Sequence, residues 1–259
     1  MIGLGISTGG ISASTLKSLG RPANTNSYSI LMDGTNDMLR QPDGDNIFDD
    51  LATGSWTLSF YIRLDTTTNQ TMFWKGSYPS NYLWFNSNSG GDIQILGSAS
   101  SGGTVINTVF NSNMSADTWH HVVITSDGSG TTRASKCYID GSEVSTNSTS
   151  PIASSTNLES HTGTAKLTTS NLASLAFYKQ YLDQVATWDS VLTAAEITEI
   201  YDNNPLLTSD SGDYASSGDL QRYYKMDENT GTTTADSSGN SNAAFTLFNG
   251  PTWSSVKPW

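Results

Sequence analysis

The segment from Ser55 to Asp65 restricts the fold of this chain more than any other, because large apolar residues alternate there with smaller or polar ones. Every second residue is large and apolar: Trp56, Leu58, Phe60, Ile62 and Leu64. Successive side chains of a β-strand point to opposite faces of its sheet. We therefore expect a strand with one set of side chains in a core and the other set facing outward.

Many other short apolar runs recur between Gly, Asn, Asp and Ser clusters, which is typical of strands joined by turns. Long helical periodicity is almost absent, so the chain is predicted to be all-β, with two stacked antiparallel sheets in a sandwich. Further strands are expected at 28–39, 71–75, 82–86, 92–97, 104–110, 118–126, 135–140, 143–147, 173–178, 182–188, 220–227 and 244–248.

One short helix is predicted after Leu192. Thr193 and Glu196 have the spacing of a capping box, in which each side chain bonds the backbone N–H of the other residue. We expect an apolar stripe of Ala194, Ile197, Ile200 and Tyr201, and an end at Asn203-Asn204-Pro205.

Composition excludes several classes of function. The net charge is −12, which argues against nucleic acid as a partner because such binding depends on Lys and Arg. No run approaches the ~20 apolar residues that span a bilayer, so membrane insertion is not expected. Cys137 is the single cysteine, which leaves no internal disulfide, and we expect it to be a small buried residue.

The first 26 residues are rich in Gly, Ser and Thr and are predicted to form an N-terminal arm, with one domain following at 27–259. Such an arm either packs on its own domain or anchors the chain to another subunit. No basic segment precedes the apolar residues at the start, so a secretory signal is a poor fit. We therefore expect synthesis in the cytoplasm.

Four stretches together resemble the laminin G-like branch of the concanavalin A-like jelly rolls. They are Met32-Asp33-Gly34-Thr35-Asn36-Asp37, the hairpin from Trp119-His120-His121-Val122 to Tyr138-Ile139-Asp140-Gly141, the run Leu182-Asp183-Gln184-Val185 with its helix, and Tyr223-Tyr224-Lys225-Met226-Asp227. The resemblance implies a jelly-roll sandwich with one short helix. In many relatives the fourth stretch precedes the first, so a circular permutation is expected here, with residues 28–39 beside 220–248.

The Gly-rich start and the Asp-Gly-Thr-Asn-Asp opening are also similar to virion-associated proteins of tailed phages. This second resemblance implies a non-catalytic capsid or tail protein on the virion surface, attached through its arm to other virion proteins or to copies of itself. The alternative is a carbohydrate-binding adhesion module, calcium-assisted and extracellular, that recognises host-surface glycans.

Two acidic turns are candidate calcium sites, because calcium takes oxygen ligands that acidic loops often supply. The first turn contains Asp33, Asn36 and Asp37, and the second contains Asp236 and Asn240. The resemblance implies that relatives often hold calcium near such loops. The alternative is turn chemistry, in which Asp and Asn bond their own backbone.

Catalysis is not expected. Retaining glycoside hydrolysis needs two carboxylates about 5–5.5 Å apart, and no strand carries acids at the alternate positions that would supply them. His120 and His121 are adjacent in a strand and face opposite ways, so they cannot bind one metal on one side. We expect a core-facing, hydrogen-bonded histidine beside Trp119 instead.

Glycan binding is predicted at Tyr78, Tyr82, Trp84 and Asn86, which could form an aromatic platform with a polar neighbour. The alternative is that these side chains pack beneath the adjacent loop, because aromatic residues supply much core area.

Overall fold

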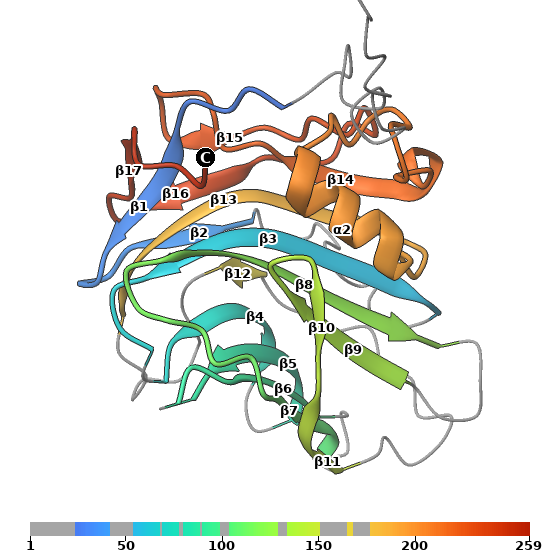
Figure 1. Ribbon diagram of the computed structural model, residues 1–259. Helices are drawn as coiled ribbons and strands as arrows, with labels where there is room; N and C mark the ends of the chain where they lie inside the picture. The colour runs from blue at the N-terminus through green and yellow to red at the C-terminus, as the bar shows by residue number, and fades with distance from the viewer. Residues whose placement is uncertain are drawn as a thin grey trace, which may run out of the picture.

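The computed structural model describes residues 24–41, 54–67, 69–77, 80–88, 90–98, 104–128, 134–150, 165–167 and 177–259. Two antiparallel sheets pack face to face in these residues, and one helix lies on the outside (Figure 1). The predicted all-β, two-sheet jelly-roll sandwich with one short helix is therefore confirmed. Among the described residues, no helix is long and apolar enough to cross a membrane.

The first sheet has the order β10-β9-β8-β3-β13-β1-β17, and β14 pairs with β13. Its strands are β10 Ser142–Val144, β9 Ala134–Ile139, β8 Trp119–Asp127, β3 Trp56–Leu64, β13 Lys179–Trp188, β1 Ser29–Asp33, β17 Thr252–Ser254 and β14 Leu220–Tyr224. The second sheet has the order β11-β7-β6-β5-β4-β12-β2-β16-β15. Its strands are β11 Thr146–Ser150, β7 Thr104–Phe110, β6 Ile93–Ser98, β5 Ser80–Ser87, β4 Thr71–Ser77, β12 Lys166–Leu167, β2 Met38–Arg40, β16 Phe245–Phe248 and β15 Thr233–Thr234.

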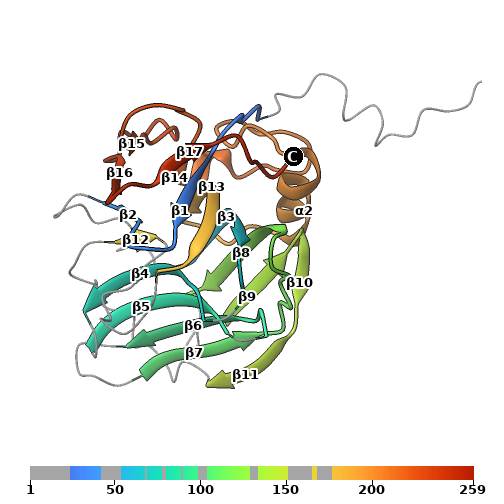
Figure 2. The ribbon, with the colours of Figure 1, turned by 90° about the vertical axis from the view of Figure 1, so that its left-hand side faces the viewer.

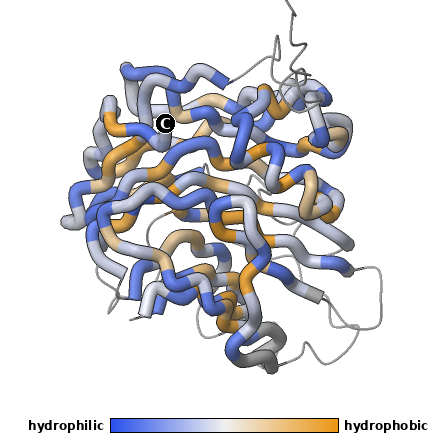
Figure 3. The backbone as a smooth tube through the Cα atoms, viewed as in Figure 1, coloured by the Kyte–Doolittle hydropathy of each residue, from blue (hydrophilic) through white to orange (hydrophobic). Residues whose placement is uncertain are grey.

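The main core lies between the sheets, and apolar residues recur along the strands with hydrophilic ones between them (Figure 3). A second apolar cluster covers the outer face of the first sheet. It contains Val123, Ala186 and Trp188 from strands and Ile197 and Ile200 from the helix α2, Ala194–Asn203. Figure 2 shows α2 on the far side of the first sheet from the second sheet.

This second cluster corrects the expectation for Ser55 to Asp65. The strand β3 is predicted with one outward face, but every residue from Trp56 to Ile62 is buried. Thr57, Ser59 and Tyr61 lie on the α2 side, where the helix and the following segment exclude water from them. The sequence period is that of a strand, while burial on both faces comes from the tertiary structure.

Several predicted boundaries also change. The segment 28–39 is two strands in different sheets, and 143–147 spans the end of β10 and the start of β11. The strand at 220–227 ends at Tyr224. A strand was expected at 173–178. Residues 173–176 lie outside the described residues, and 177–178 are not in a strand.

The first and last strands lie side by side, and the expected neighbours 28–39 and 220–248 meet through β2 and β16. In the first sheet β1 pairs with β17, with Ser29 opposite Ser254. In the second sheet β2 pairs with β16, with Leu39 opposite Leu247. The strand β14 is one strand further away, on β13.

The helix begins as predicted. Thr193 is its N-cap, and the capping box with Glu196 is present. Its buried face contains Glu196, Ile197, Glu199 and Ile200, whereas Ala194 and Tyr201, expected in the apolar stripe, are exposed. Cys137 is buried, as predicted.

Candidate functional site

The predicted glycan residues lie on the outer face of the second sheet. In β5, Leu83 and Phe85 point into the core, so Tyr82, Trp84 and Asn86 point the other way. The neighbouring strand β4 places Trp74 opposite Trp84. The strand pairing therefore gathers aromatic side chains on one outer face.

Trp84 is the one residue of the predicted set whose described side chain is half-buried rather than buried. Tyr82 is 9% exposed and Asn86 is 6% exposed, which agrees with the packing alternative for those two. Tyr78 lies outside the described residues. The ring of Trp74 stacks on Tyr82 with centroids 5.3 Å apart.

The Trp84 ring is held in place by its neighbours. Its Nε1 donates to Thr71 Oγ1 at 3.1 Å, and its ring meets Trp74 edge-on at 6.0 Å. Trp74 is fully buried and its own Nε1 donates to Gly76 O. A half-buried indole fixed in this way loses little side-chain entropy when a ligand stacks on it.

Sequence reasoning missed the residues that surround Trp84 on β6 and β7. Leu96 lies opposite Trp84 and Asn107 lies opposite Leu96, while Gln94 and Val109 form the next row. All four are half-buried, and Gln94 Nε2 donates to Asn107 Oδ1 at 3.0 Å. The sequence signal for these residues is the alternation from Ile93 to Leu96, whose polar and apolar outward set is Gln94 and Leu96. We call Trp84, Gln94, Leu96, Asn107 and Val109 the outer strip.

Two cations lie on the same sheet beyond Trp74. Lys166 of β12 is opposite Trp74, and Arg40 of β2 is opposite Lys166. The Arg40 guanidinium lies over the Phe248 ring, 5.6 Å from its centroid. Strand spacing places Lys166 two strands from Trp84, about 10 Å away.

The first acidic turn is held by its own hydrogen bonds. Thr35 N donates to Asp33 Oδ1 at 2.7 Å, and Asp33 N donates to Asp37 Oδ2 at 2.9 Å. Asn36 uses its backbone oxygen to accept from the side chain of Asn249. Burial raises the pKa of Asp37, and the neighbouring Asp33 carboxylate adds to that rise, while the Asp33 N–H opposes it.

In the second acidic turn, both oxygens of the Asp236 carboxylate accept hydrogen bonds from the turn and its neighbours. Asp236 Oδ1 accepts from the N–H groups of Tyr223 and Ser238, both at 3.0 Å. Asp236 Oδ2 accepts from Ser238 Oγ and from both nitrogens of Asn242. Burial alone would raise the pKa of Asp236, but these donors hold it below its ordinary value. Asn240 donates its side-chain nitrogen to Leu220 O and Gln221 O.

These contacts do not fit Asp236 to a calcium ion, because five N–H or O–H donors already occupy its oxygens. Among the described residues, no group of three or more His, Cys, Asp or Glu side chains could hold a metal. The predicted sites at Asp33, Asn36 and Asp37 and at Asp236 and Asn240 therefore have the hydrogen-bond pattern of turns.

The two histidines face opposite sides, as predicted. His121 is buried, and its Nε2 forms a hydrogen bond with Ser59 Oγ at 2.8 Å. Its ring stacks on Tyr61, with ring centroids 4.5 Å apart. Burial lowers the pKa of His121 to about 3, against the opposing attraction of Asp140.

His120 lies between Ser115 and Asp140. Its Nδ1 is 2.9 Å from Asp140 Oδ2, and its Nε2 is 3.2 Å from Ser115 Oγ. The backbone N–H of Ser115 also donates to the same Nε2 at 3.2 Å. Since that N–H already uses the Nε2 lone pair, His120 caps a turn and is not placed as a general base for Ser115.

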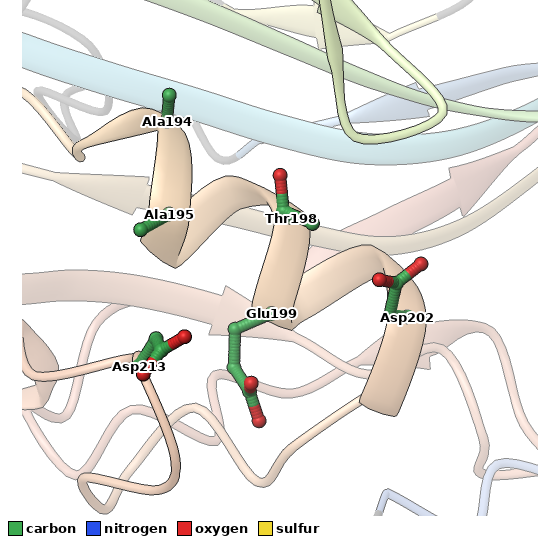
Figure 4. Close-up of a pocket in the computed structure, with 6 residues that line it drawn as sticks. All are labelled: Ala194, Ala195, Thr198, Glu199, Asp202 and Asp213. Atoms are coloured by element: carbon green, nitrogen blue, oxygen red, sulfur yellow. The ribbon is translucent and has the colours of Figure 1, made fainter. Parts of the chain in front are cut away.

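An acidic hollow lies on the outer side of α2, far from the outer strip. Figure 4 shows Glu199, Asp202 and Asp213 among its lining residues. The last turn of α2 carries Asp202 and no basic residue, so this carboxylate adds to the negative end of the helix dipole. This face therefore disfavours anionic ligands.

Comparison with known proteins agrees with the fold. A family model described as the concanavalin A-like lectin/glucanases superfamily, of the laminin G type, matches residues 33–198. No curated protein matches the sequence. Among solved structures, a proposed carbohydrate-binding protein from Bacteroides ovatus ATCC 8483 is similar with a TM-score of 0.59 and 15% identity, over 90% of this chain and 61% of that one.

The receptor-binding domain of botulinum neurotoxin D is similar with a TM-score of 0.50 and 14% identity, over 71% of this chain and 46% of that one. This chain thus spans less than two thirds of either protein. At such identities the likeness concerns the fold alone. The family match covers more than half of the sequence, so the chain belongs to the laminin G-like branch of the concanavalin A-like lectin/glucanase superfamily.

Proposed function

We propose that this domain is a non-catalytic carbohydrate-binding module, and that it binds glycans on the outer strip of β5, β6 and β7. The observation that carries the proposal is the half-buried Trp84, held by Trp74 and Thr71 beside the amide pair of Gln94 and Asn107. The expected ligand is one or two pyranose rings, because three strands span about 10 Å.

The chemistry of the strip matches that of a sugar. The C–H face of a pyranose is apolar and can stack on an indole ring, while its hydroxyl groups both donate and accept hydrogen bonds. With Gln94 Nε2 donating to Asn107 Oδ1, the arrangement presents Gln94 Oε1 as an acceptor and Asn107 Nδ2 as a donor. Leu96 and Val109 add apolar contact beside them.

Binding is preferred to catalysis because the strands from β4 to β7 contain no Asp or Glu. A pair of carboxylates flanking a sugar on this face is therefore not supplied by those strands. The lectin-type fold and the likeness to the Bacteroides ovatus protein also support binding.

The proposal is tested by a glycan array, followed by calorimetry on the best hit. Trp84→Ala is expected to weaken binding at least tenfold, which corresponds to about 1.4 kcal/mol. Tyr201→Ala is the matched control, because Tyr201 is a 40% exposed aromatic on α2, on the other side of the molecule. Equal affinity of the Trp84→Ala and wild-type proteins, or no glycan bound at all, would refute the proposal.

The virion role stays a prediction from the sequence, as does the virion-surface location. Of the predicted attachment arm, residues 1–26, the structure describes Asn24 to Asn26. Asn24 and Asn26 pack on the domain: Asn24 N donates to Asn204 O at 2.8 Å, and Asn26 is fully buried. An adhesion module and a virion component are compatible roles for one protein.

A further inference from the structure

The connection between β16 and β17 contains the single Asn-Gly pair of the sequence, Asn249-Gly250. Asn249 has a φ of 67° and Gly250 has a φ of 119°. Asparagine tolerates positive φ and glycine adopts it freely, so turn geometry accounts for the choice of both residues. Both residues are also exposed to solvent. The pair is therefore open to a reaction that turn geometry does not require.

This connection lies beside the one between β1 and β2. Each of them crosses from one sheet to the other, since β1 and β17 belong to the first sheet and β2 and β16 to the second. We call the two connections the crossings. The pairing of β1 with β17 and of β2 with β16 brings them to the same end of the strands. The side chain of Asn249 joins the crossings, because its Nδ2 donates to Asn36 O at 3.0 Å.

The backbone N–H of Gly250 donates to no acceptor among the described residues. Gly250 also has no β-carbon to shield that nitrogen. A β-carbon built there would meet Asp37 Oδ1 at 3.5 Å, which is an ordinary contact. The nitrogen is therefore free to ionise and to approach the side-chain carbonyl carbon of the preceding residue, Asn249.

We propose that Asn249 is a site of spontaneous deamidation, and that the reaction breaks the hydrogen bond that joins the two crossings. The Gly250 nitrogen attacks Cγ of Asn249, so that an N–Cγ bond forms and a cyclic imide closes. The Cγ–Nδ2 bond breaks, and Nδ2 leaves as ammonia with the proton that the Gly250 nitrogen gives up. Water then opens the imide. Opening at Cγ gives aspartate, whereas opening at the main-chain carbonyl carbon gives isoaspartate.

Asn240 is an exposed asparagine in the same part of the chain and provides the contrast. It is followed by Ser241, which has a side chain, and its Nδ2 donates to both Leu220 O and Gln221 O. The amide of Asn249 is held by one acceptor instead of two. A hydrogen bond that must break before ring closure slows the reaction by up to about tenfold. We therefore expect Asn249 to react about tenfold faster than Asn240.

Deamidation changes the contacts between the crossings. An aspartate side chain has no N–H to donate to Asn36 O, so two groups that only accept hydrogen bonds would face each other. The new carboxylate also adds a negative charge close to Asp37, whose Oδ1 lies beside Gly250, and like charges repel. Isoaspartate in addition lengthens the main chain by a carbon atom. The short edge strand β17 follows directly, so it should be the element that loosens first.

The test ages the folded full chain at about pH 7 and at about pH 9, and locates the product by mass spectrometry. The tryptic peptide that starts at Met226 contains both Asn249 and Asn240, so each sample carries its own comparison. We expect aspartate and isoaspartate at residue 249, with faster accumulation at the higher pH because the reacting nitrogen must ionise. An isoaspartate-specific methyltransferase should label the aged wild-type protein but not Asn249→Gln, whose longer side chain closes a larger ring slowly.

Gly250→Ala gives a result that does not depend on correct folding. Its β-carbon hinders the attacking nitrogen, so the product at residue 249 should fall both in buffer and in urea. The proposal is overturned if wild-type Asn249 stays intact in the folded chain while it reacts in urea, because the hydrogen bond to Asn36 O would then protect the amide. Equal rates at Asn249 and Asn240 would overturn it as well, since the local structure would not select the site.

The effect on the crossings is measured with Asn249→Asp, which has the side chain of the aspartate product. Its melting temperature should lie about 2–4 °C below that of the wild type, as expected for the loss of a hydrogen bond in a chain of this size. The same substitution made in an Asp37→Asn protein should lower the melting temperature by less, because the repulsion is removed. If Asn249→Asp melts at the wild-type temperature, the Asn249 amide does not hold the crossings together.

Discussion

Lowering the pH from about 7.5 to about 5 should destabilise this domain through His121. The imidazole is fully buried between the rings of Tyr61 and Tyr201, with Ser59 Oγ on its Nε2. Burial lowers its pKa in the folded state to about 3, and its Nδ1 has no partner. The folded protein therefore keeps His121 neutral at both pH values.

The sign follows from proton binding to the unfolded chain. In the unfolded chain His121 has a pKa of about 6.5, so at pH 5 the unfolded state binds a proton that the folded state does not bind. Stability is then lost as the pH falls below about 6.5, and the loss continues to the folded pKa near 3. A pH of 5 lies about 1.5 units below the histidine pKa of the unfolded chain. At 1.36 kcal/mol per unit, the free energy of unfolding is therefore about 2 kcal/mol lower at pH 5.

Urea denaturation at both pH values measures this loss, and a variant isolates it. His121→Phe keeps a ring between the two tyrosines but cannot take up a proton, so its loss of stability over the same range should be about 2 kcal/mol smaller. Ser59→Ala is the control, because it removes the hydrogen bond and keeps the histidine. The other titrating groups are shared by all three proteins. Equal pH dependence of the wild-type and His121→Phe proteins would refute the reasoning.

Two further substitutions test the packing. Trp188→Ala removes a fully buried indole from the cluster under α2 and should cost about 3–5 kcal/mol in urea denaturation, whereas Val191→Ala, at a 38% exposed position nearby, should stay within about 0.5 kcal/mol. Gly91→Ala should destabilise by clearly more than Gly231→Ala. Both glycines have a φ of 79°, but a Cβ at Gly91 would collide with the carbonyl oxygen of Met114 while one at Gly231 meets nothing within 4 Å. Strain at positive φ alone costs about 1–2 kcal/mol, so equal melting temperatures of the two variants would contradict the clash.

Local patterns in the sequence predicted local structure well. The capping box of Thr193 and Glu196 forms as expected, because both partners lie within one turn of helix. The hairpin from Trp119 to Gly141 also forms, with Val122 opposite Ile139. In each case the interacting groups are close in sequence, so spacing alone determines their geometry.

Features that depend on distant segments were not predicted. The burial of Ser59 and Tyr61 requires α2, which lies far along the chain. The run Leu182 to Val185 places two polar residues between two apolar ones, which breaks the alternation of a strand at the bulge but does not indicate which distant segment packs against Asp183. Its partner Asn26 is separated from it by 157 residues. The acidic composition of the two turns predicted calcium sites. The donors that occupy the oxygens of Asp236 come from several segments, and their positions depend on the tertiary structure.

The pairing of β1 with β17 has a mechanical consequence. Ser29, at the start of β1, is opposite Ser254, at the end of β17, and Ser29 Oγ donates to Val256 O. Tension that pulls the two ends of the chain apart therefore loads the bonds of this ladder one after another, as in peeling, instead of all together in shear. The strand β17 should detach at low force, while β1 keeps its second ladder with β13.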